Sequence, residues 1–395
     1  MKRTLPSLAG QPLEGERAFV RVDFNVPLDD GRVTDLTRIR AALPTITWLR
    51  ERGCRVVLAS HLGRPKGIRA PAFSLEPVKR VLESELGVPV EFLEDLGESA
   101  VRATQRLRRG QVMLLENTRF WPGEQVNDPA LAQSFADLGD FYVNDAFGAA
   151  HRAHASTEGV AHLLAPAVAG LLMARELEYL SDALSNPKRP FLAVLGGAKI
   201  SGKIDVIAAL LDQVDTILVG GAMANTFFLA MGLDVGASLV EHDRVEMAHE
   251  LIERAGDRLV LPETVVIARS LSPDAEWEEV TRNAVPPGWS IFDVGASSAE
   301  AFVERIKQAS TVVWNGPMGV FETPPFDRGT MILAQGVADA TDHGCVTVVG
   351  GGDSAAAVSA AGLEDRVSHV STGGGAALEL LEGKTLPGIA ALDDL

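Results

Sequence analysis

Cysteine is nearly absent from the 395-residue chain, which has only Cys54 and Cys345. Each begins an apolar run, CRVVLAS and CVTVVG, so we predict two buried reduced thiols rather than a disulfide framework or a cysteine metal site. Long hydrophobic runs are missing too, because the most lipid-like stretch, 161–174, has 14 residues and includes a histidine and a proline. The basic start of the chain is followed by no apolar run. These absences predict a cytoplasmic protein without a secretion signal or membrane span.

Basic residues are fewer than acidic ones. The chain has 36 Lys+Arg against 53 Asp+Glu, a formal net charge of −17, which argues against a broad basic face for nucleic acid. The deficit is uneven, because residues 1–168 hold 21 basic and 21 acidic residues, whereas residues 169–395 hold 15 and 32. This asymmetry indicates two domains. With 38 glycines and 46% hydrophobic residues, the composition is typical of an α/β enzyme, not of a disordered or fibrous chain.

Short β-branched runs recur at spacings that leave room for a helix between them, which is the pattern of βαβ units and parallel sheets. We predict strands at 18–24, 54–60, 89–93, 111–116 and 141–145 in the first half, and at 191–197, 216–221, 258–268, 290–295, 311–316, 345–352 and 366–374 in the second. Helical periodicity fills the gaps, for example over 37–49. The predicted fold class is α/β, with a domain junction in a helix over about 169–185, before the turn at 185–190.

Polar residues follow almost every predicted strand of the first half. Ligands of open parallel sheets bind beyond the carboxyl ends of the strands. The tails RVDFNVP, SHLGRP, LENTRF and NDAFGAAHRAHAS, together with TRIR, supply Arg21, Arg38, His61, Arg64, Arg119, His151, Arg152 and His154. One such residue in a loop is usually a surface group, but their repetition at one edge predicts a site for a small polyanion. Asp23 and Asn25 are placed to hold a hydroxyl or an arginine, or else to serve the turn before Pro27.

Glycine clusters mark the strand ends of the second half, at 196–203, 220–223, 314–319, 350–354 and 371–376. Amides at such turns approach phosphate closely and helix N-termini add a favourable dipole, so we predict a nucleotide site. Residues 197–203 begin like a Walker A loop, but Ile204 stands where Ser or Thr holds Mg²⁺, which argues against a P-loop NTPase. A dinucleotide fingerprint is also missing.

Three further groups of charged residues in the second half are candidates for binding a nucleotide or its metal ion. Lys199 and Lys203, two of only eight lysines, would share one face if a helix began there. Asp353 in GGGDS is placed to hold the Mg²⁺ of a nucleotide, or else to cap the next helix. Glu322 can accept a ribose hydroxyl, or is an ordinary loop acid. On these residues alone the prediction stops at a two-domain phosphotransferase with its nucleotide in the second half.

Eight motifs, in order along almost the whole chain, resemble those of the phosphoglycerate kinase family: RVDFNVP, SHLGRP, LENTRF, NDAFGAAHRAHAS, GGAKISGKI, VVWNGPMGVFE, GGGDSAAAV and HVSTGGGAALELLEGKTLPG. The resemblance implies two Rossmann-like three-layer α/β/α domains with parallel sheets, joined by a hinge helix about which they close. The phosphoglycerate-binding domain would comprise 1–168 plus about 385–395, and the nucleotide-binding domain 169–384. The implied reaction is reversible phosphoryl transfer from 1,3-bisphosphoglycerate to MgADP, giving 3-phosphoglycerate and MgATP in glycolysis and gluconeogenesis. The implied protein is a monomer with Mg²⁺ as cofactor and without nucleic-acid or membrane partners.

Carried over residue by residue, the resemblance implies three sets of site residues. The triose acid and its phosphate are assigned to Asp23, Asn25, Arg38, His61, Leu62, Gly63, Arg64, Arg119 and Arg152, with Arg21, His151 and His154 in the outer basic patch. The nucleotide is assigned to Gly196, Gly197, Lys199, Lys203, Gly295, Asn315, Glu322, Gly351, Gly352, Asp353 and Ser354, and its Mg²⁺ to Asp353. The transferring group is assigned to Arg38, Lys203 and the amides of Gly373 and Gly374. No implied residue is lost, although Leu36, Gly202 and Ser354 differ from many relatives.

Two other functions stay open at this point. One is a kinase of another small carboxylic acid that forms an acyl phosphate, and the many cations of the first half argue instead for a substrate that bears its own phosphate. The other is a nucleotide-sensing or scaffold protein that keeps the fold without catalysis. Such a protein is expected to lose Arg38, Lys203 or Asp353, and all three are present.

Overall fold

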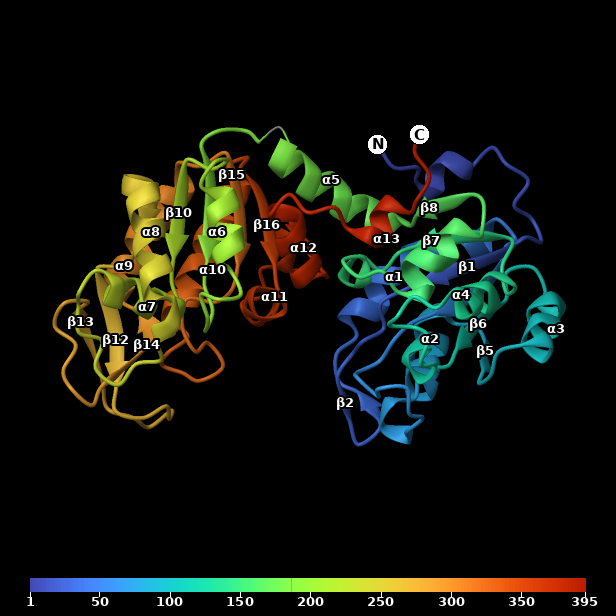
Figure 1. The fold of residues 1–395 in the computed structure, drawn as a ribbon, viewed down its shortest axis with the longest axis horizontal. Helices are drawn as coiled ribbons and strands as arrows, with labels where there is room; N and C mark the ends of the chain where they lie inside the picture. The colour runs from blue at the N-terminus through green and yellow to red at the C-terminus, as the bar shows by residue number, and fades with distance from the viewer. Residues whose placement is uncertain (186) are drawn as a thin grey trace. The chain divides into compact units, whose positions relative to one another are not determined.

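The computed structural model describes residues 1–185 and 187–395, with side chains outside residues 181–186. The chain divides into two compact units, Met1–Leu177 with Thr385–Leu395, and Glu178–Lys384 (Figure 1). The dividing point lies within helix α5 (Leu171–Ser185). The turn predicted at 185–190 includes residue 186, which lies outside the described residues.

A six-stranded parallel sheet forms the centre of the first unit, in the order β5-β6-β4-β1-β7-β8. Its strands are β1 (Arg17–Arg21), β4 (Arg55–Ala59), β5 (Val90–Leu93), β6 (Val112–Leu115), β7 (Phe141–Asn144) and β8 (Ala167–Ala169). The order reverses between β1 and β7, so a ligand crevice is expected beyond their carboxyl ends. Strand β8 was not predicted, because its three residues are too few to carry a strand pattern. A two-stranded hairpin, β2 (Leu28–Asp29) and β3 (Arg32–Val33), follows β1.

Helices cover both faces of this sheet. Helices α1 (Thr37–Glu51) and α2 (Glu76–Leu86) bury apolar residues such as Ile46 and Val78 in one core with Val20 and Leu58 of the sheet. On the other face, the ring of Phe19 lies 5.8 Å from that of Phe135 on α4 (Pro129–Ala136). Helix α3 (Glu98–Arg106) follows β5. The unit therefore has the predicted three layers.

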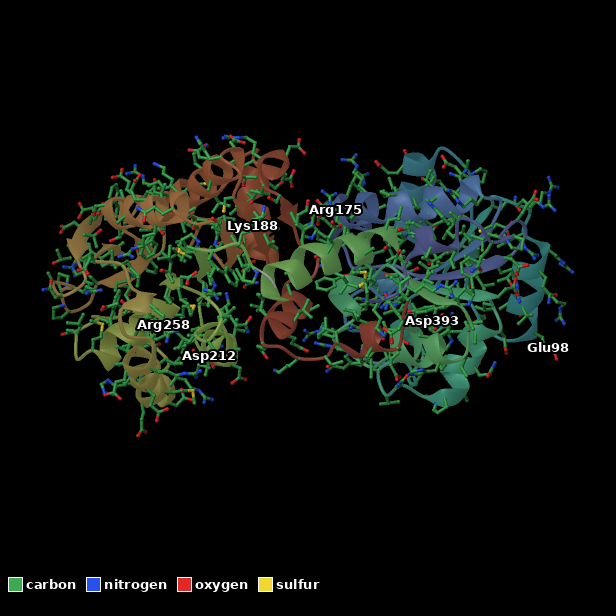
Figure 2. All side chains as sticks on the ribbon, turned by 90° about the horizontal axis from the view of Figure 1, so that it is seen from above. Glu98, Arg175, Lys188, Asp212, Arg258 and Asp393 are labelled. Carbon is green, nitrogen blue, oxygen red and sulfur yellow. The ribbon has the colours of Figure 1, made fainter. Side chains whose placement is uncertain are left out.

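The C-terminal segment packs on the first unit, and Figure 2 labels Asp393 there. The amide of Arg3 donates to the carbonyl of Asp393 (2.8 Å). At the end of β7, Asn144 Nδ2 donates to the carbonyl of Gly388 (2.9 Å) in the short helix α13 (Pro387–Ala390). The side chain of Leu392 is buried here. The end of the chain therefore belongs to the structure that carries the first ligand edge.

The second unit has its own six-stranded parallel sheet, in the order β11-β10-β9-β15-β16-β17. Its strands are β9 (Phe191–Leu195), β10 (Thr216–Val219), β11 (Leu259–Val260), β15 (Thr311–Asn315), β16 (Val346–Gly350) and β17 (His369–Val370). Helices α9 (Ala296–Lys307) and α10 (Arg328–Asp342) bury Phe302 and Leu333 in one core with Trp314. Strand residues with the opposite orientation, such as Ala193, are buried as well, so both faces are covered.

The remaining helices of this unit are short. They are α6 (Ile204–Leu210), α7 (Met223–Ala230), α8 (Val245–Ala255), α11 (Gly352–Ala360) and α12 (Gly374–Leu381). Each of α6, α7, α11 and α12 begins just after a glycine-rich strand end. The prediction of two parallel-sheet α/β domains is confirmed.

A three-stranded antiparallel sheet in the second unit was not predicted. It consists of β13 (Trp277–Thr281), β12 (Thr264–Ala268) and β14 (Ser290–Val294) in the order β13-β12-β14. The predicted strand 258–268 is wrong as one element, because Pro262 interrupts it and sends β11 and β12 into different sheets. The predicted strand 290–295 is antiparallel β14. Strand β13 has the sequence WEEVT, with exposed glutamates and no apolar run, so the sequence pattern did not predict it.

Both cysteines, Cys54 and Cys345, are buried free thiols, as predicted. Within the ranges that the structure describes, no helix combines the length and apolar character needed to cross a bilayer.

Replacing Leu392 by alanine tests the role of the C-terminal segment. Leu392 is 3% exposed, whereas Leu395 is 73% exposed. We expect Leu392→Ala to lower the free energy of unfolding of the first unit by about 2–5 kcal/mol, because it leaves a cavity. Urea unfolding and hydrogen exchange of the β8 amides measure the loss. Leu395→Ala is the matched control and should change little, and equal stability of the two variants would contradict the assignment.

Candidate active site

Loops beyond the ends of β1, β4, β6 and β7 enclose a pocket of about 210 Å³ in the first unit. Its lining residues are Asn25, His61, Gly63, Arg64, Arg119, Gly148, Ala149, His151, Arg152 and His154. The structure thus brings together most of the residues predicted to bind a polyanion. Gly148 and Ala149 were not predicted, because small apolar residues carry no chemical signal in a sequence.

Arg38, on the first turn of α1, is tied to the loop that follows β1. Its Nη1 donates to Asp23 Oδ2 (3.3 Å) and to the carbonyl of Asn25 (2.9 Å). The side-chain oxygen of Asn25 in turn accepts from the amide of Gly63 (2.8 Å). Asp23 therefore positions an arginine, and its Oδ1 also accepts from the amide of Asn25 (3.2 Å), so the arginine and turn roles proposed from the sequence are both present.

Asn117 is a structural residue of the pocket that sequence reasoning missed. It is fully buried, and its Oδ1 accepts from the amides of Leu62 (3.1 Å) and Arg119 (3.0 Å). Its Nδ2 donates to the carbonyls of Leu62 (2.7 Å) and Phe73 (2.9 Å). Both backbone groups of Leu62, a predicted substrate-binding residue, are thus used within the protein. The only signal in the sequence is a polar residue close behind a buried strand.

Burial and mutual repulsion determine the charges in this pocket. Burial lowers the pKa of Arg119 to about 10, and the neighbouring Arg21 and Arg152 add to the shift. Burial, followed by the positive charges of Arg21 and Arg119, holds the pKa of His61 well below its usual range. The same causes lower the pKa of His154 to about 3. His61 and His154 are therefore neutral at pH 7, and the arginines supply positive charge to the pocket.

In the second unit, Lys203 lies at the point where the order of the parallel strands reverses. Its Nζ donates to the carbonyls of Gly196 (2.6 Å) and Asn315 (2.7 Å), which end the neighbouring strands β9 and β15. A Cβ at Gly316 would lie 2.5 Å from Nζ, so only glycine leaves room for the amine. Burial lowers the pKa of Lys203 to about 8, against the opposing effect of Asp353.

Backbone hydrogen bonds join the glycine turns around Lys203 to one another. The amide of Gly197 donates to the carbonyl of Pro317 (2.9 Å), and that of Gly221 donates to Met318 (2.9 Å). Gly197 and Gly221 have φ of +108° and +66°, a region that other residues rarely adopt. A Cβ at Gly196 would lie 2.1 Å from the carbonyl oxygen of Pro317. Three strand ends therefore form one rigid surface.

Two helix N-termini meet beside this surface. Gly351, with φ of +94°, precedes α11 and leaves Gly352 and Asp353 exposed in its first turn. Gly374 begins α12, and a Cβ there would lie 2.5 Å from the Cα of Gly351. The positive ends of both helices and the amides of their first turns are suited to bind phosphate.

Asn315 and Ser354 lie beneath these helix starts. Asn315 Nδ2 is buried and has no hydrogen-bond partner within the described part of the chain, and it faces Gly351, where a Cβ would be 3.3 Å away. An unpaired buried donor is costly, and a ligand oxygen would satisfy it. Ser354 is fully buried, and its Oγ accepts from the amide of Gly316 (2.6 Å). Ser354 thus fixes the loop rather than facing the open edge.

The expectation that Lys199 and Lys203 share one helical face is wrong. Helix α6 begins at Ile204, so Lys199 lies in the loop before it, exposed to solvent. Glu322, in the loop after β15, is exposed as well.

Gly295 and Gly373, two glycines predicted as site residues, have surroundings within the protein that account for them at least in part. Gly295 follows β14 and is the N-cap of α9, and a Cβ there would lie 2.1 Å from Thr264 Oγ1, so close packing accounts for this glycine. The amide of Gly373 donates to Ser371 Oγ (3.3 Å), whereas Gly374 opens helix α12.

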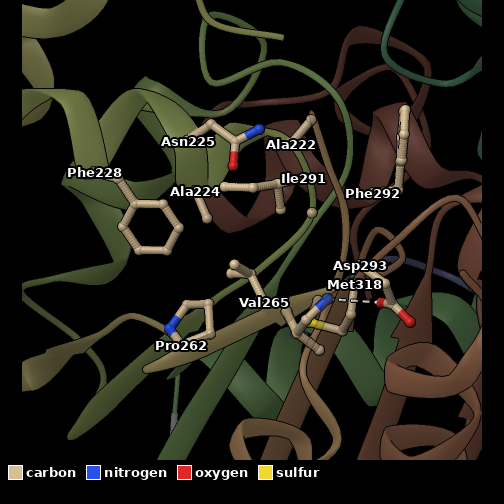
Figure 3. A pocket seen from close by; sticks show the side chains of 12 residues that line it. Ala222, Ala224, Asn225, Phe228, Pro262, Val265, Ile291, Phe292, Asp293 and Met318 are labelled. Carbon is tan, nitrogen blue, oxygen red and sulfur yellow. Dashed lines mark hydrogen bonds between the residues drawn. The ribbon is translucent and has the colours of Figure 1, made fainter. Parts of the chain in front are cut away.

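A small cavity of about 10 Å³ lies behind the glycine turns, with Ala222, Phe228 and Val265 among its lining residues (Figure 3). It has room for a water molecule at most. Beside it, the buried carboxyl of Asp293 accepts from the amides of Val294 and Gly329, both at 2.8 Å. Burial raises the pKa of Asp293 to about 8, against the lowering effect of these two hydrogen bonds, and the bond from Gly329 ties the carboxyl to the start of α10.

One unit offers an arginine-lined anion pocket, and the other offers a buried lysine, glycine turns and helix N-termini beyond its strands. Such a pair of sites on two parallel-sheet domains defines a two-domain phosphotransferase.

Comparison with known proteins then identifies the family. The family model described as phosphoglycerate kinase matches residues 8–384. The chain is 58% identical over 387 residues to phosphoglycerate kinase of Chloroflexus aurantiacus, covering 96% of each, and 54% identical over 398 residues to that of Chlorobaculum tepidum, covering 100% of each. Solved phosphoglycerate kinases of Coxiella burnetii (TM-score 0.86, 44% identity, 97% of each chain) and Pyrococcus horikoshii (TM-score 0.87, 33% identity, 99% of this chain and 98% of that one) have the same fold. The chain belongs to the phosphoglycerate kinase family and is a kinase.

The amine of Lys203 is expected to titrate near pH 8 in the unliganded protein, because burial disfavours its charged form. Its Cε chemical shift, followed by NMR in lysine-labelled protein and assigned with Lys203→Ala, measures this. Lys307, whose pKa is raised by Glu304, is the internal control. Asp353→Asn should lower the pKa of Lys203 further, since it removes the stabilising charge. Titration of Lys203 in the ordinary lysine range would contradict the role of burial.

Proposed function

We propose that the chain catalyses reversible transfer of a phosphoryl group from 1,3-bisphosphoglycerate to MgADP, which yields 3-phosphoglycerate and MgATP. The observation that carries this proposal is the division of binding chemistry, in a member of this family, between an arginine-lined pocket and a lysine site with helix N-termini. The relatives named above support the choice of substrates.

The phosphoglycerate belongs, in this proposal, to the pocket of the first unit. A triose acid with a phosphate carries several negative charges, and Arg64, Arg119 and Arg152 line a pocket large enough for it. Asn25 and the neutral His61 add donors that suit hydroxyl and carboxylate oxygens. Arg38, held by Asp23, is assigned to the transferring phosphoryl group.

The adenine nucleotide belongs, in the same proposal, to the strand ends of the second unit. The helix starts at Gly352 and Gly374 supply amides for phosphate, the unpaired Nδ2 of Asn315 supplies a further donor, and Glu322 is assigned to the ribose. Lys203 is assigned to the transferring group.

The donor set suits a Mg²⁺ ion that arrives with the nucleotide. Within the described residues, no group of three or more His, Cys, Asp and Glu side chains can cage a metal. Mg²⁺ commonly takes one or two carboxylates, with water and phosphate completing its coordination. The exposed Asp353 would hold it, and the ion would neutralise phosphate charge when bound.

The chemistry requires positioning and charge stabilisation rather than a general base. In the direction from ATP the nucleophile is the carboxylate of 3-phosphoglycerate, which is already ionised at neutral pH. A bond forms between a carboxylate oxygen and the γ-phosphorus while the bond from that phosphorus to the β,γ-bridging oxygen breaks. Arg38 and Lys203 stabilise the equatorial oxygens. The two ligands must meet in line, so the proposal includes closure about α5.

Turnover that depends on ATP, 3-phosphoglycerate and Mg²⁺, coupled to reduction of the 1,3-bisphosphoglycerate formed, tests the proposal. We expect Lys203→Ala to reduce kcat by about 10²–10³-fold, by analogy with the loss of one oxyanion donor. Lys307→Ala, which removes a lysine on the surface of α9 that pairs with Glu304, serves as the matched control and should change kcat little. A folded wild type that binds MgADP but turns over no 3-phosphoglycerate would refute the proposal and call for other phosphorylated acids.

Arg152→Ala tests the assignment of the first pocket. Arg152 lines the first pocket and is not part of the nucleotide site. We therefore expect KM for 3-phosphoglycerate to rise about 10–100-fold, the value of a lost charged hydrogen bond, and KM for MgATP to stay the same. Steady-state kinetics with each substrate varied measures both. Arg80→Ala, on the exposed face of α2 and paired with Glu76, is the matched arginine control. A rise in KM for MgATP alone would place the phosphoglycerate elsewhere.

A further inference from the structure

A buried chain of hydrogen bonds runs beneath the pocket of the first unit. Its members are Glu124, Ser156, Arg21 and His61, of which the first three have no exposed surface. Ser156 Oγ donates to Glu124 Oε1 (2.5 Å), Arg21 Nε donates to Ser156 Oγ (2.8 Å), and Arg21 Nη2 lies 3.1 Å from His61 Nδ1. Neither Glu124 nor Ser156 touches the pocket, and neither was singled out from the sequence.

The direction of each bond is fixed by chemistry. A guanidinium group has only donors, so both Ser156 Oγ and His61 Nδ1 must accept from Arg21. The hydroxyl proton of Ser156 is then directed to Glu124, whose carboxylate is an acceptor. Because Nδ1 of His61 accepts, the ring proton must be on Nε2. His61 lines the pocket, so this tautomer supplies it with an N–H donor.

The position of Arg21 depends on Glu124. A fully buried guanidinium is costly unless it is paired and hydrogen-bonded. Glu124 provides a negative charge through Ser156, and its Oε2 also accepts from the amide of Ser156 (3.0 Å), which fixes the geometry. The amide of Ala155 donates to the carbonyl of Glu124 (2.9 Å), so the loops after β6 and β7 are joined at this point. The carbonyl of Val22 accepts from Arg21 Nη1.

Other charged groups near His61 are consistent with this arrangement. Asp23 Oδ1 lies 3.9 Å from Nδ1, too far for a hydrogen bond, so Arg21 is the closer partner of that nitrogen. Burial and the positive charges of Arg21, Arg119 and Arg38 hold the pKa of His61 well below its usual range, and the ring stays neutral.

We propose that Glu124 and Ser156 are positioning residues that act through Arg21 to hold His61 as the neutral Nε2–H tautomer, the form that donates to an oxygen of the bound substrate. The substrate named here rests on the proposed function. The tautomer itself does not, because it is set in the unliganded protein.

The direct test is ¹⁵N NMR of histidine-labelled protein at pH 7 without ligand, with the His61 signals among those of eight histidines assigned from His61→Gln. We expect wild-type His61 to carry its proton on Nε2. In Ser156→Ala, Arg21 loses the hydroxyl group that holds its Nε and links it to Glu124, so its hydrogen bond to His61 Nδ1 weakens. We therefore expect signals that report a mixture of the two neutral tautomers. A wild-type His61 that is charged or protonated on Nδ1 would overturn the proposal, and the tautomer is read from the wild type, with His61→Gln used only to assign its signals.

Kinetics supplies a second readout. We expect Ser156→Ala to raise KM for 3-phosphoglycerate about tenfold, the cost of one weakened hydrogen bond to a charged ligand, and to leave KM for MgATP unchanged. Glu124→Gln keeps an acceptor for Ser156 and is expected to retain the Nε2–H tautomer to a greater extent than Ser156→Ala. Ser134→Ala, on α4 away from the chain, is the serine control. An unchanged tautomer and KM in folded Ser156→Ala would refute the proposal, whereas absence of turnover in the wild type would refute the proposed function alone.

Discussion

All strands of a parallel sheet end at the same edge, and this constraint determines where both candidate sites lie. In each unit the order of the strands reverses next to the first strand, so the loops diverge and leave a crevice. The carbonyls of Gly196 and Asn315, at the ends of adjacent strands, are near enough to share one lysine amine. In the first unit, loops from four strands reach one pocket.

The site depends on backbone atoms as much as on side chains. Leu62 is held in place through both of its backbone polar groups, and glycine at 196, 316 and 374 permits approaches that a Cβ would block. The chain exploits two different properties of glycine here. At 197 and 351 the residue provides a positive φ, whereas at 196 and 374 the lack of a side chain lets one strand end or helix start lie against another.

Sequence patterns predicted the parts of the fold that repeat and missed the parts that do not. The apolar runs before glycine or charged tails located the central strands, because fully buried parallel strands read as continuous hydrophobic segments. Strand β13 has exposed glutamates, and β8 has three residues, so neither has such a run. The site residues with charge were likewise visible in their motifs. Asn117 and Glu124 were not, because their importance lies in bonds between loops that are distant from each other in the sequence.

Burial determines which groups around the first pocket are charged and which are neutral. A cation such as Arg21 can be buried beneath the pocket only with an anion nearby, and Glu124 meets this need through Ser156. His61 and His154 stay neutral, because burial disfavours their charged forms and the arginines repel further positive charge. The pocket thus gains donors from His61 without the cost of another desolvated cation. Arg64 and Arg152 line the pocket and are exposed, so they attract an anion, whereas the buried His61 supplies a directional hydrogen bond. Attraction and directional hydrogen bonding are thus supplied by different residues.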